Sequence, residues 1–132
     1  MRRFMLDTDI CIYVMRERSQ PLRERFRQSS GEMCISALTL AELLYGAEKS
    51  VRRDHNLRIL EEFSSRLETL DFGAKAAAHF GQLRAELERA GTPAGAYDML
   101  IGAHARSEGL IVVTNNRREY DRMPGLRVEN WV

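Results

Sequence analysis

The chain opens on a short apolar run that ends in acidic residues, Phe4-Met5-Leu6-Asp7-Thr8-Asp9. Three apolar residues followed by a charge predict a short strand, and a helical pattern begins directly after Asp7. Asp7 therefore either caps that helix, as Asp often does, or serves as a functional acid at the carboxyl end of a strand. Asp9 fits a first-turn charge or a supporting role at the same site.

Beyond this stretch, the chain alternates between short apolar runs and helical patterns. Further strands are predicted over 33–36, 67–72, 110–113 and, more weakly, 126–128. Helices are predicted over 8–17, 21–28, 39–49, 51–66, 74–89 and 97–107. This alternation, without a tight hairpin signal, predicts an α/β fold with a central parallel sheet of four to five strands flanked by helices. We expect one domain over residues 1–132, with ligands at the carboxyl ends of the strands.

The composition excludes several classes of protein. Lysine and arginine total 20 against 19 acidic residues, so the net charge of +1 does not identify a partner. No apolar run is long enough to span a membrane and no signal peptide is recognisable, so we expect a cytoplasmic protein without membrane contact. Cys11 and Cys34 lie in apolar runs without metal-ligand spacing, which indicates reduced core residues.

Two further acids interrupt apolar helical patterns. Glu42 is the one charged residue of the Leu38–Gly46 segment. A helix that is apolar nearly all round is expected to be buried, and a buried carboxylate requires a partner or a metal; the alternative is a Glu42 that reaches solvent at the helix edge. Asp98 lies at the start of the 97–107 helix, where it either stabilises the first turn or joins the same site as Asp7.

The predicted strand over 110–113 ends in the polar residues Thr114-Asn115-Asn116, at the same edge of the sheet as Asp7. Thr114 and Asn116 can hydrogen-bond a carboxylate or a metal-bound water, and Glu119 is the nearest acid in this segment. Carboxylates without His or Cys partners suit Mg²⁺ or Mn²⁺ and a substrate phosphate. The set therefore predicts metal-assisted hydrolysis at a phosphoryl group.

Five segments of the chain occur in an order and spacing that are typical of one family. They are Met5–Thr8, Ile35–Ala47, Tyr97–Ala105, Val113–Asn116 and Pro124–Trp131. Together these segments resemble the PIN domain family and, more narrowly, the VapC toxins of bacterial type II toxin–antitoxin modules. The resemblance covers essentially the whole chain. It implies a Mg²⁺-dependent, site-specific endoribonuclease, in which Mn²⁺ can substitute, with Asp7, Glu42 and Asp98 as catalytic, metal-binding acids.

The fourth acid of the site is where the chain departs from the family pattern. Many PIN domains carry an acid two residues after the strand-end threonine, and this chain has Asn116 there. The resemblance implies Glu119 as the fourth catalytic acid, with Thr114, Asn116 and Asp9 in support, and it leaves Asn116 as the alternative. Position 9 is usually Asn in the family, so Asp9 adds a negative charge that can draw a metal ion or raise the pKa of a neighbour.

The resemblance also implies partners. It predicts a homodimer that a VapB-like antitoxin neutralises, in a higher hetero-oligomer that binds operator DNA only through the antitoxin. The expected substrate is structured RNA, first of all tRNA, so that cleavage inhibits translation. Arginines that could contact RNA phosphates are Arg16, Arg18, Arg23, Arg25, Arg27, Arg117, Arg118 and Arg122. Apolar residues that could form the antitoxin or dimer surface are Leu22, Phe26, Leu43, Leu44 and Tyr45.

Two other functions compete with the nuclease. A haloacid-dehalogenase-like phosphatase would use Asp7 as its nucleophile, because its opening motif also has two aspartates separated by one residue. That fold also needs a late lysine, and the last lysine here is Lys75. A small α/β interaction module would use the acids only as helix caps, and Mn²⁺ would not stabilise it. Neither alternative explains Glu42, which favours the nuclease.

Overall fold

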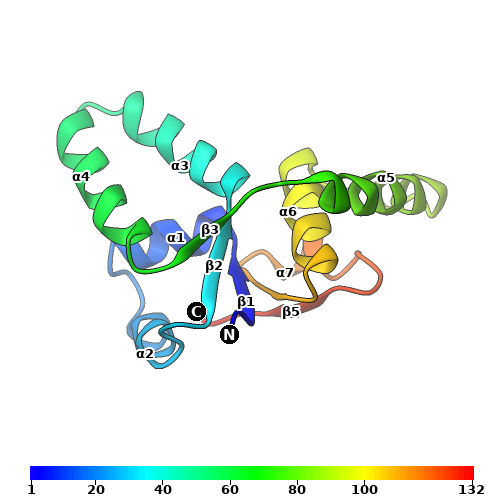
Figure 1. Cartoon of the computed structure of the whole chain (residues 1–132), viewed down its shortest axis with the longest axis horizontal. Helices are drawn as coiled ribbons and strands as arrows, with labels where there is room; N and C mark the ends of the chain where they lie inside the picture. Colours follow the sequence, from blue (N-terminus) through cyan, green and yellow to red (C-terminus); the bar gives the residue numbers. More distant parts are fainter.

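Five parallel strands form the centre of the computed structural model, which describes residues 1–132. The strands are β1 (Phe4–Leu6), β2 (Met33–Ser36), β3 (Glu68–Leu70), β4 (Ile111–Val113) and β5 (Arg127–Glu129). They form one sheet in the order β3-β2-β1-β4-β5, and every neighbouring pair is parallel (Figure 1). The predicted fold class is therefore confirmed.

Seven helices connect the strands. They are α1 (Thr8–Met15), α2 (Gln20–Gln28), α3 (Ala37–Glu48), α4 (Arg53–Ser64), α5 (Ala74–Arg89), α6 (Ala96–Ser107) and α7 (Arg117–Tyr120). None of them is both long and apolar enough to cross a membrane. The predicted helix over 8–17 ends earlier, at Met15, and Glu17 has a left-handed backbone (φ 52°) that no α-helix contains. The four-residue α7 is too short to produce a helical period in the sequence.

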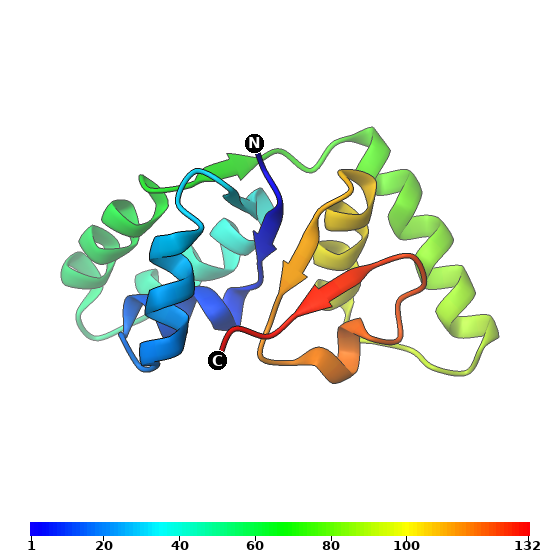
Figure 2. The same cartoon turned by 90° about the horizontal axis from the view of Figure 1, so that it is seen from below.

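The sheet buries two apolar faces because side chains alternate along each strand. Phe4 and Leu6 of β1 pack in a cluster with residues of α1, α2 and α4, whereas Met5 packs with residues of α5 and α6. Figure 2 shows these two groups of helices on opposite sides of the sheet. The edge strands β3 and β5 pair on one side only and are partly exposed, and both differ from their predicted bounds, 67–72 and 126–128.

The order of the strands determines where the acids meet. β1 lies between β2 and β4, so the chain leaves β1 in one direction across the sheet and later returns on its other side, which creates a crevice at the carboxyl edge. The register pairs Leu6 with Val113, which brings Asp7 beside Thr114. The helix α3 follows β2 and starts at this edge, and α6 runs back toward the start of β4, so its first turn with Asp98 also lies there.

Candidate functional site

A small pocket of about 110 Å³ lies at the carboxyl edge of the sheet and contains four acids. Its lining residues follow β1 directly or lie in α1, α3, α6 and α7, and they are Asp7, Thr8, Asp9, Glu42, Tyr97, Asp98, Ile101 and Tyr120. The three acids that the sequence predicts as metal ligands thus share one pocket, although they are up to 91 positions apart in the chain (98 − 7). Asp9 lines the same pocket and is exposed to solvent.

Asp7 is buried, with 4% of its surface exposed, and both of its carboxylate oxygens accept hydrogen bonds. The Ile10 backbone N–H donates to Oδ1 at 2.9 Å, so Asp7 caps α1, and the Thr114 hydroxyl donates to Oδ2 at 2.5 Å. Burial raises the pKa of Asp7 to about 7, against the lowering effect of these two hydrogen bonds. Asp7 therefore caps α1 and also lines the acidic pocket, so its role as a cap leaves the predicted functional role open.

Asp98 is held more loosely, by two longer hydrogen bonds. The Tyr120 hydroxyl donates to Oδ1 at 3.3 Å, and the Asn116 side-chain amide donates to Oδ2 at 3.5 Å. Asp98 is half-buried; its pKa is raised first by burial and then by the negative charge of Glu119. Asn116 thus contacts an acid of the pocket directly, whereas Glu119 acts on the same acid through its charge.

Glu119 lies just outside the pocket with one unused oxygen. Its Oε2 is buried and accepts no hydrogen bond, and the nearest cation is the Arg122 guanidinium at 3.7 Å. A buried carboxylate oxygen without a hydrogen-bond donor has lost its hydration without a replacement, which is unfavourable, and a nearby cation would offset that loss. This orphaned oxygen is consistent with a fourth acid at the rim of a cation site.

Glu42 is only half-buried, which corrects the reason for selecting it. The helix α3 is not buried on all of its sides, because the apolar residues Leu44 and Tyr45 are exposed to solvent. Glu42 nevertheless turns into the acidic pocket, where the Thr8 hydroxyl donates to its Oε1 at 2.6 Å. Glu42 therefore lines the predicted site, although it is less buried than the sequence indicates.

Four lining residues are not among the predicted site residues: the apolar Ile101, and Thr8, Tyr97 and Tyr120, which carry polar groups. Thr8 follows Asp7 directly and orients Glu42, which the spacing alone does not reveal. Tyr120 is almost fully buried and touches Asp98 from α7, a helix without a sequence signature. Tyr97 directly precedes Asp98, and this adjacency is the one feature of the sequence that could have placed Tyr97 at the site.

The donor set fits a hard divalent cation that retains water. The pocket offers carboxylate oxygens from several elements, although no group of three or more Asp, Glu, His or Cys side chains is arranged so that it could hold one metal ion together. Ions such as Mg²⁺ bind through one or two carboxylates and keep several waters, so a closed cage of protein ligands is not required. No histidine lines the pocket, and His104 is buried and hydrogen-bonded to Ser36.

Comparisons with known proteins match the chain over its full length. A family model described as the PIN domain matches residues 4–126. The tRNA(fMet)-specific endonuclease VapC of Salmonella typhimurium is 54% identical over 131 residues, and the match covers 99% of each chain. Ribonuclease VapC2 of Haemophilus influenzae is 52% identical over 132 residues, with 100% of each chain covered. The chain belongs to the VapC family of PIN-domain ribonucleases.

Solved structures agree with this assignment. A chain in the DNA-bound VapBC of Salmonella typhimurium superimposes with a TM-score of 0.96 at 54% identity and full coverage of both chains. A chain in VapBC2 of Rickettsia felis, bound to a promoter DNA fragment, gives a TM-score of 0.93 at 39% identity, with 98% of each chain covered. As a VapC-type protein, the chain is the toxin and ribonuclease of a toxin–antitoxin pair, and PIN-domain nucleases generally depend on divalent metal ions.

The membership in the VapC family corrects one alternative, and the structure corrects one surface prediction. The haloacid-dehalogenase-like phosphatase is not supported, since the family model and the relatives account for the whole chain. Of the predicted apolar surface, Leu22, Phe26 and Leu43 are core residues. Of the arginines beside the site, Arg117 pairs with Asp121 and Arg122 pairs with Glu119, so only Arg118 there is free of ion pairs.

Proposed function

We propose that Asp7, Glu42 and Asp98 hold Mg²⁺, for which Mn²⁺ can substitute, and that the site cleaves structured RNA, with tRNA as the substrate. The observation that carries the proposal is the single pocket that these three acids share with Asp9. A relative at 54% identity that is named a tRNA(fMet)-specific endonuclease supports initiator tRNA as the particular substrate. Cleavage of a tRNA would inhibit translation.

The side chains of the chain have distinct roles in this proposal. When bound, the divalent ion supplies activation of water and neutralises charge on the phosphate. Thr114 and the Ile10 N–H hold the Asp7 carboxylate in one orientation, and Thr8 orients Glu42. Tyr120 and Asn116 set the position of Asp98.

Glu119 is proposed as the fourth catalytic acid, in preference to Asn116. Its Oε2 has no hydrogen-bond donor in the chain and is close enough to Asp98 to raise the pKa of that carboxyl. Asn116 is neutral, and its amide nitrogen already donates toward Asp98. Asp9 adds exposed negative charge at the mouth of the pocket, which attracts cations.

RNA contact beside the site is assigned to Arg118, and the arginines of the first two helices contribute less than their number implies. Arg25 and Arg27 are engaged in ion pairs with Glu129 and Glu24. Arg118 is exposed on α7 and unpaired, next to the acidic pocket. If it contacts a phosphate, Arg118→Ala will reduce the salt dependence of tRNA binding by a slope of roughly 0.7 to 0.9, measured on a catalytically inactive variant.

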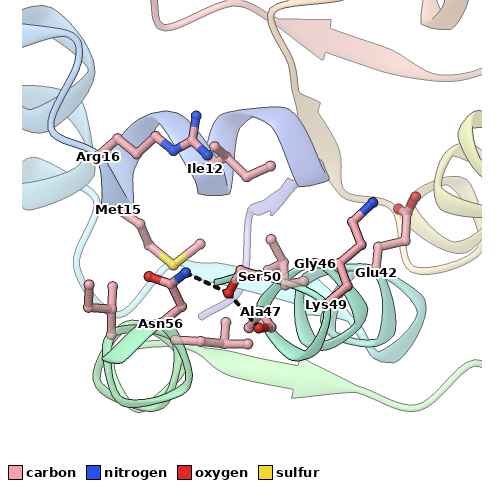
Figure 3. A pocket seen from close by; sticks show the side chains of 12 residues that line it. Ile12, Met15, Arg16, Glu42, Gly46, Ala47, Lys49, Ser50 and Asn56 are labelled. Atoms are coloured by element: carbon pink, nitrogen blue, oxygen red, sulfur yellow. Dashed lines mark hydrogen bonds between the residues drawn. The ribbon is translucent and has the colours of Figure 1, made fainter. Parts of the chain in front are cut away.

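A larger groove beside the acidic pocket is the proposed seat of the VapB-like antitoxin. Its volume is about 330 Å³, and it lies between α1, α3 and α4 over an apolar floor that includes Ile12, Met15 and Ile59. Figure 3 shows Lys49 and Glu42 at one end, with Arg16 across from them on α1. Since Glu42 lines both this groove and the acidic pocket, a segment bound here would also obstruct the site.

The proposed assembly is one in which the toxin is held in a complex with its antitoxin. We propose a homodimer in a higher hetero-oligomer with the antitoxin, which binds operator DNA only through the antitoxin, in the cytoplasm. The similar solved structures are VapBC complexes bound to DNA, which supports a complex with an antitoxin for this chain. Light scattering that shows a monomer at tens of micromolar would remove the homodimer from the proposal.

The cleavage proposal has a direct test. Purified protein is incubated with a tRNA(fMet) transcript, a pool of other tRNAs and ribosomal RNA, with Mg²⁺ or with EDTA, and the new 5′ ends are mapped. We expect a single cut in tRNA(fMet) that requires Mg²⁺ and is absent in Asp98→Asn. Cleavage of another RNA but not of tRNA(fMet) would contradict the proposed substrate. Cleavage in EDTA, or by Asp98→Asn, would contradict the proposed metal site.

A further inference from the structure

One exposed aromatic ring stands at the mouth of the acidic pocket. Tyr97 lines the pocket and leaves 52% of its surface exposed to solvent. The other aromatic of the lining, Tyr120, is 1% exposed and donates its hydroxyl to Asp98. Tyr97 is therefore the only aromatic side chain that both borders the acids and remains accessible to a ligand.

The position of Tyr97 in α6 directs its ring toward the pocket. Residues four apart lie on the same face of a helix, and Ile101, four positions after Tyr97, is buried and lines the same pocket. Asp98 is the next residue in the first turn, so the ring and the carboxylate share one short stretch of backbone. The part of the pocket that α6 forms thus carries the Asp98 carboxylate, the buried Ile101 side chain and the exposed ring of Tyr97.

The Tyr97 ring has no structural role that explains its position. Its hydroxyl takes no part in the hydrogen bonds that hold Asp7, Glu42 or Asp98. By contrast, the other strongly exposed tyrosine, Tyr45, packs against a cation of its own helix, with the Lys49 ammonium 4.7 Å from the ring centre. An aromatic face left open beside a phosphate-cleaving site is available to a nucleobase, because every base has a flat π-face that stacks on such a ring.

We propose that Tyr97 stacks on the nucleobase next to the scissile phosphate and is a specificity-determining residue of the RNA site. This inference rests on the proposed cleavage of RNA. With a divalent ion bound by the acids, a phosphate drawn to that ion would bring its own nucleotides within reach of the pocket rim, where the ring of Tyr97 would support one base that has left the RNA stack. The site then selects unpaired nucleotides, since a base inside a duplex cannot reach the ring.

Kinetics of four variants test the role of the ring. Replacement of a stacking aromatic by alanine weakens base binding by roughly 5-fold to 150-fold, so Tyr97→Ala should raise KM within that range with kcat nearly unchanged. Tyr97→Phe should match the wild type, and Tyr97→Leu should behave like Tyr97→Ala. Val51→Ala is the control, because it shortens a fully exposed apolar side chain outside the pocket, and its KM should not change.

A modified substrate separates stacking from a structural effect. Once the cut is mapped with the wild type, the nucleotide on each side of it is made abasic in turn. At one of the two positions the abasic RNA should raise the KM of the wild type as much as Tyr97→Ala does, and it should not raise the KM of Tyr97→Ala further. Additive effects at both positions, or a Tyr97→Ala that changes the oligomeric state and not KM, would overturn the inference while RNA cleavage stands. If the wild type cuts none of the RNAs, the proposed function fails and the stacking fails with it.

Discussion

The acidic pocket has two corners that are built in different ways. At the strand corner, β1 and β4 hold the buried Asp7 through a short hydrogen bond from Thr114 and a backbone N–H from α1. At the helix corner, α6 and α7 hold the half-buried Asp98 through hydrogen bonds of 3.3 and 3.5 Å from Tyr120 and Asn116. The comparison indicates a fixed acid at the strand corner and an adjustable acid at the helix corner, which a cation can draw into place.

The largest expected effect is the loss of activity when either corner loses its charge. Asp7→Asn and Asp98→Asn each keep the size of the side chain and remove a metal-binding carboxylate, so the rate of RNA cleavage should fall on the order of 1000-fold or more. Single-turnover cleavage with saturating Mg²⁺ measures this effect. Normal cleavage by either variant would remove that acid from the site.

Stability without metal should separate the two corners. Burial raises the pKa of Asp7 from 3.8 to about 7, so the folded protein binds a proton that the unfolded chain releases, and the free energy of unfolding falls as the pH rises from about 4 to about 7. Asp7→Asn should therefore be more stable than the wild type above pH 7 in EDTA, by up to about 4 kcal/mol, and the gain should vanish near pH 4.

Denaturant unfolding at a series of pH values, with EDTA or Mn²⁺, gives these free energies. Asp98→Asn should gain less, because Asp98 is only half-buried. Mn²⁺ should stabilise the wild type and not Asp7→Asn. An equal response of both variants to pH would mean that the two corners do not differ as described.

Removal of the hydrogen-bond donors probes the same difference at a smaller scale. Thr114→Val leaves the buried Asp7 oxygen without its donor and should destabilise the fold by about 1–3 kcal/mol. Tyr120→Phe removes a longer hydrogen bond from an acid that solvent can reach, so its effect should be below about 1 kcal/mol. Urea unfolding of the two variants measures both values, and a larger loss for Tyr120→Phe would reverse the assignment of the fixed corner.

The smallest effect should distinguish the two candidates for the fourth position. Glu119→Gln removes a charge next to Asp98, whereas Asn116→Ala removes a neutral amide, and charged oxygen ligands contribute more to Mg²⁺ binding. The Mg²⁺ concentration for half-maximal cleavage should therefore rise more in Glu119→Gln, by a few-fold. An equal or larger shift in Asn116→Ala would transfer the role to Asn116.

Local patterns predicted most of the fold and the identities of the acids. Phe4–Leu6 and Met33–Ser36 have their predicted bounds because these central strands are buried at every residue and contain short apolar runs, whereas the edge strand β3 is partly exposed and its ends are ambiguous in sequence. The approach of Asp98 to Asp7 could not come from spacing, since it depends on the order of strands and on the direction of α6. The family resemblance supplied that information.

The hydrogen-bond partners of the acids were the least predictable part. Thr114 meets Asp7 because the register aligns Leu6 with Val113, and a shift of one residue would separate them. Tyr120 lies on a helix of four residues, which is too short for a periodic pattern. These contacts depend on tertiary structure and not on local sequence.

The central claim is that acids from both corners bind one divalent cation site, and anomalous diffraction from crystals soaked in Mn²⁺ tests it most directly. We expect anomalous density in the acidic pocket, within about 2.0–2.4 Å of carboxylate oxygens of both Asp7 and Asp98, and no density there in crystals of Asp98→Asn. Saturating Mn²⁺ that leaves this pocket without density, or that binds one corner alone, would contradict it.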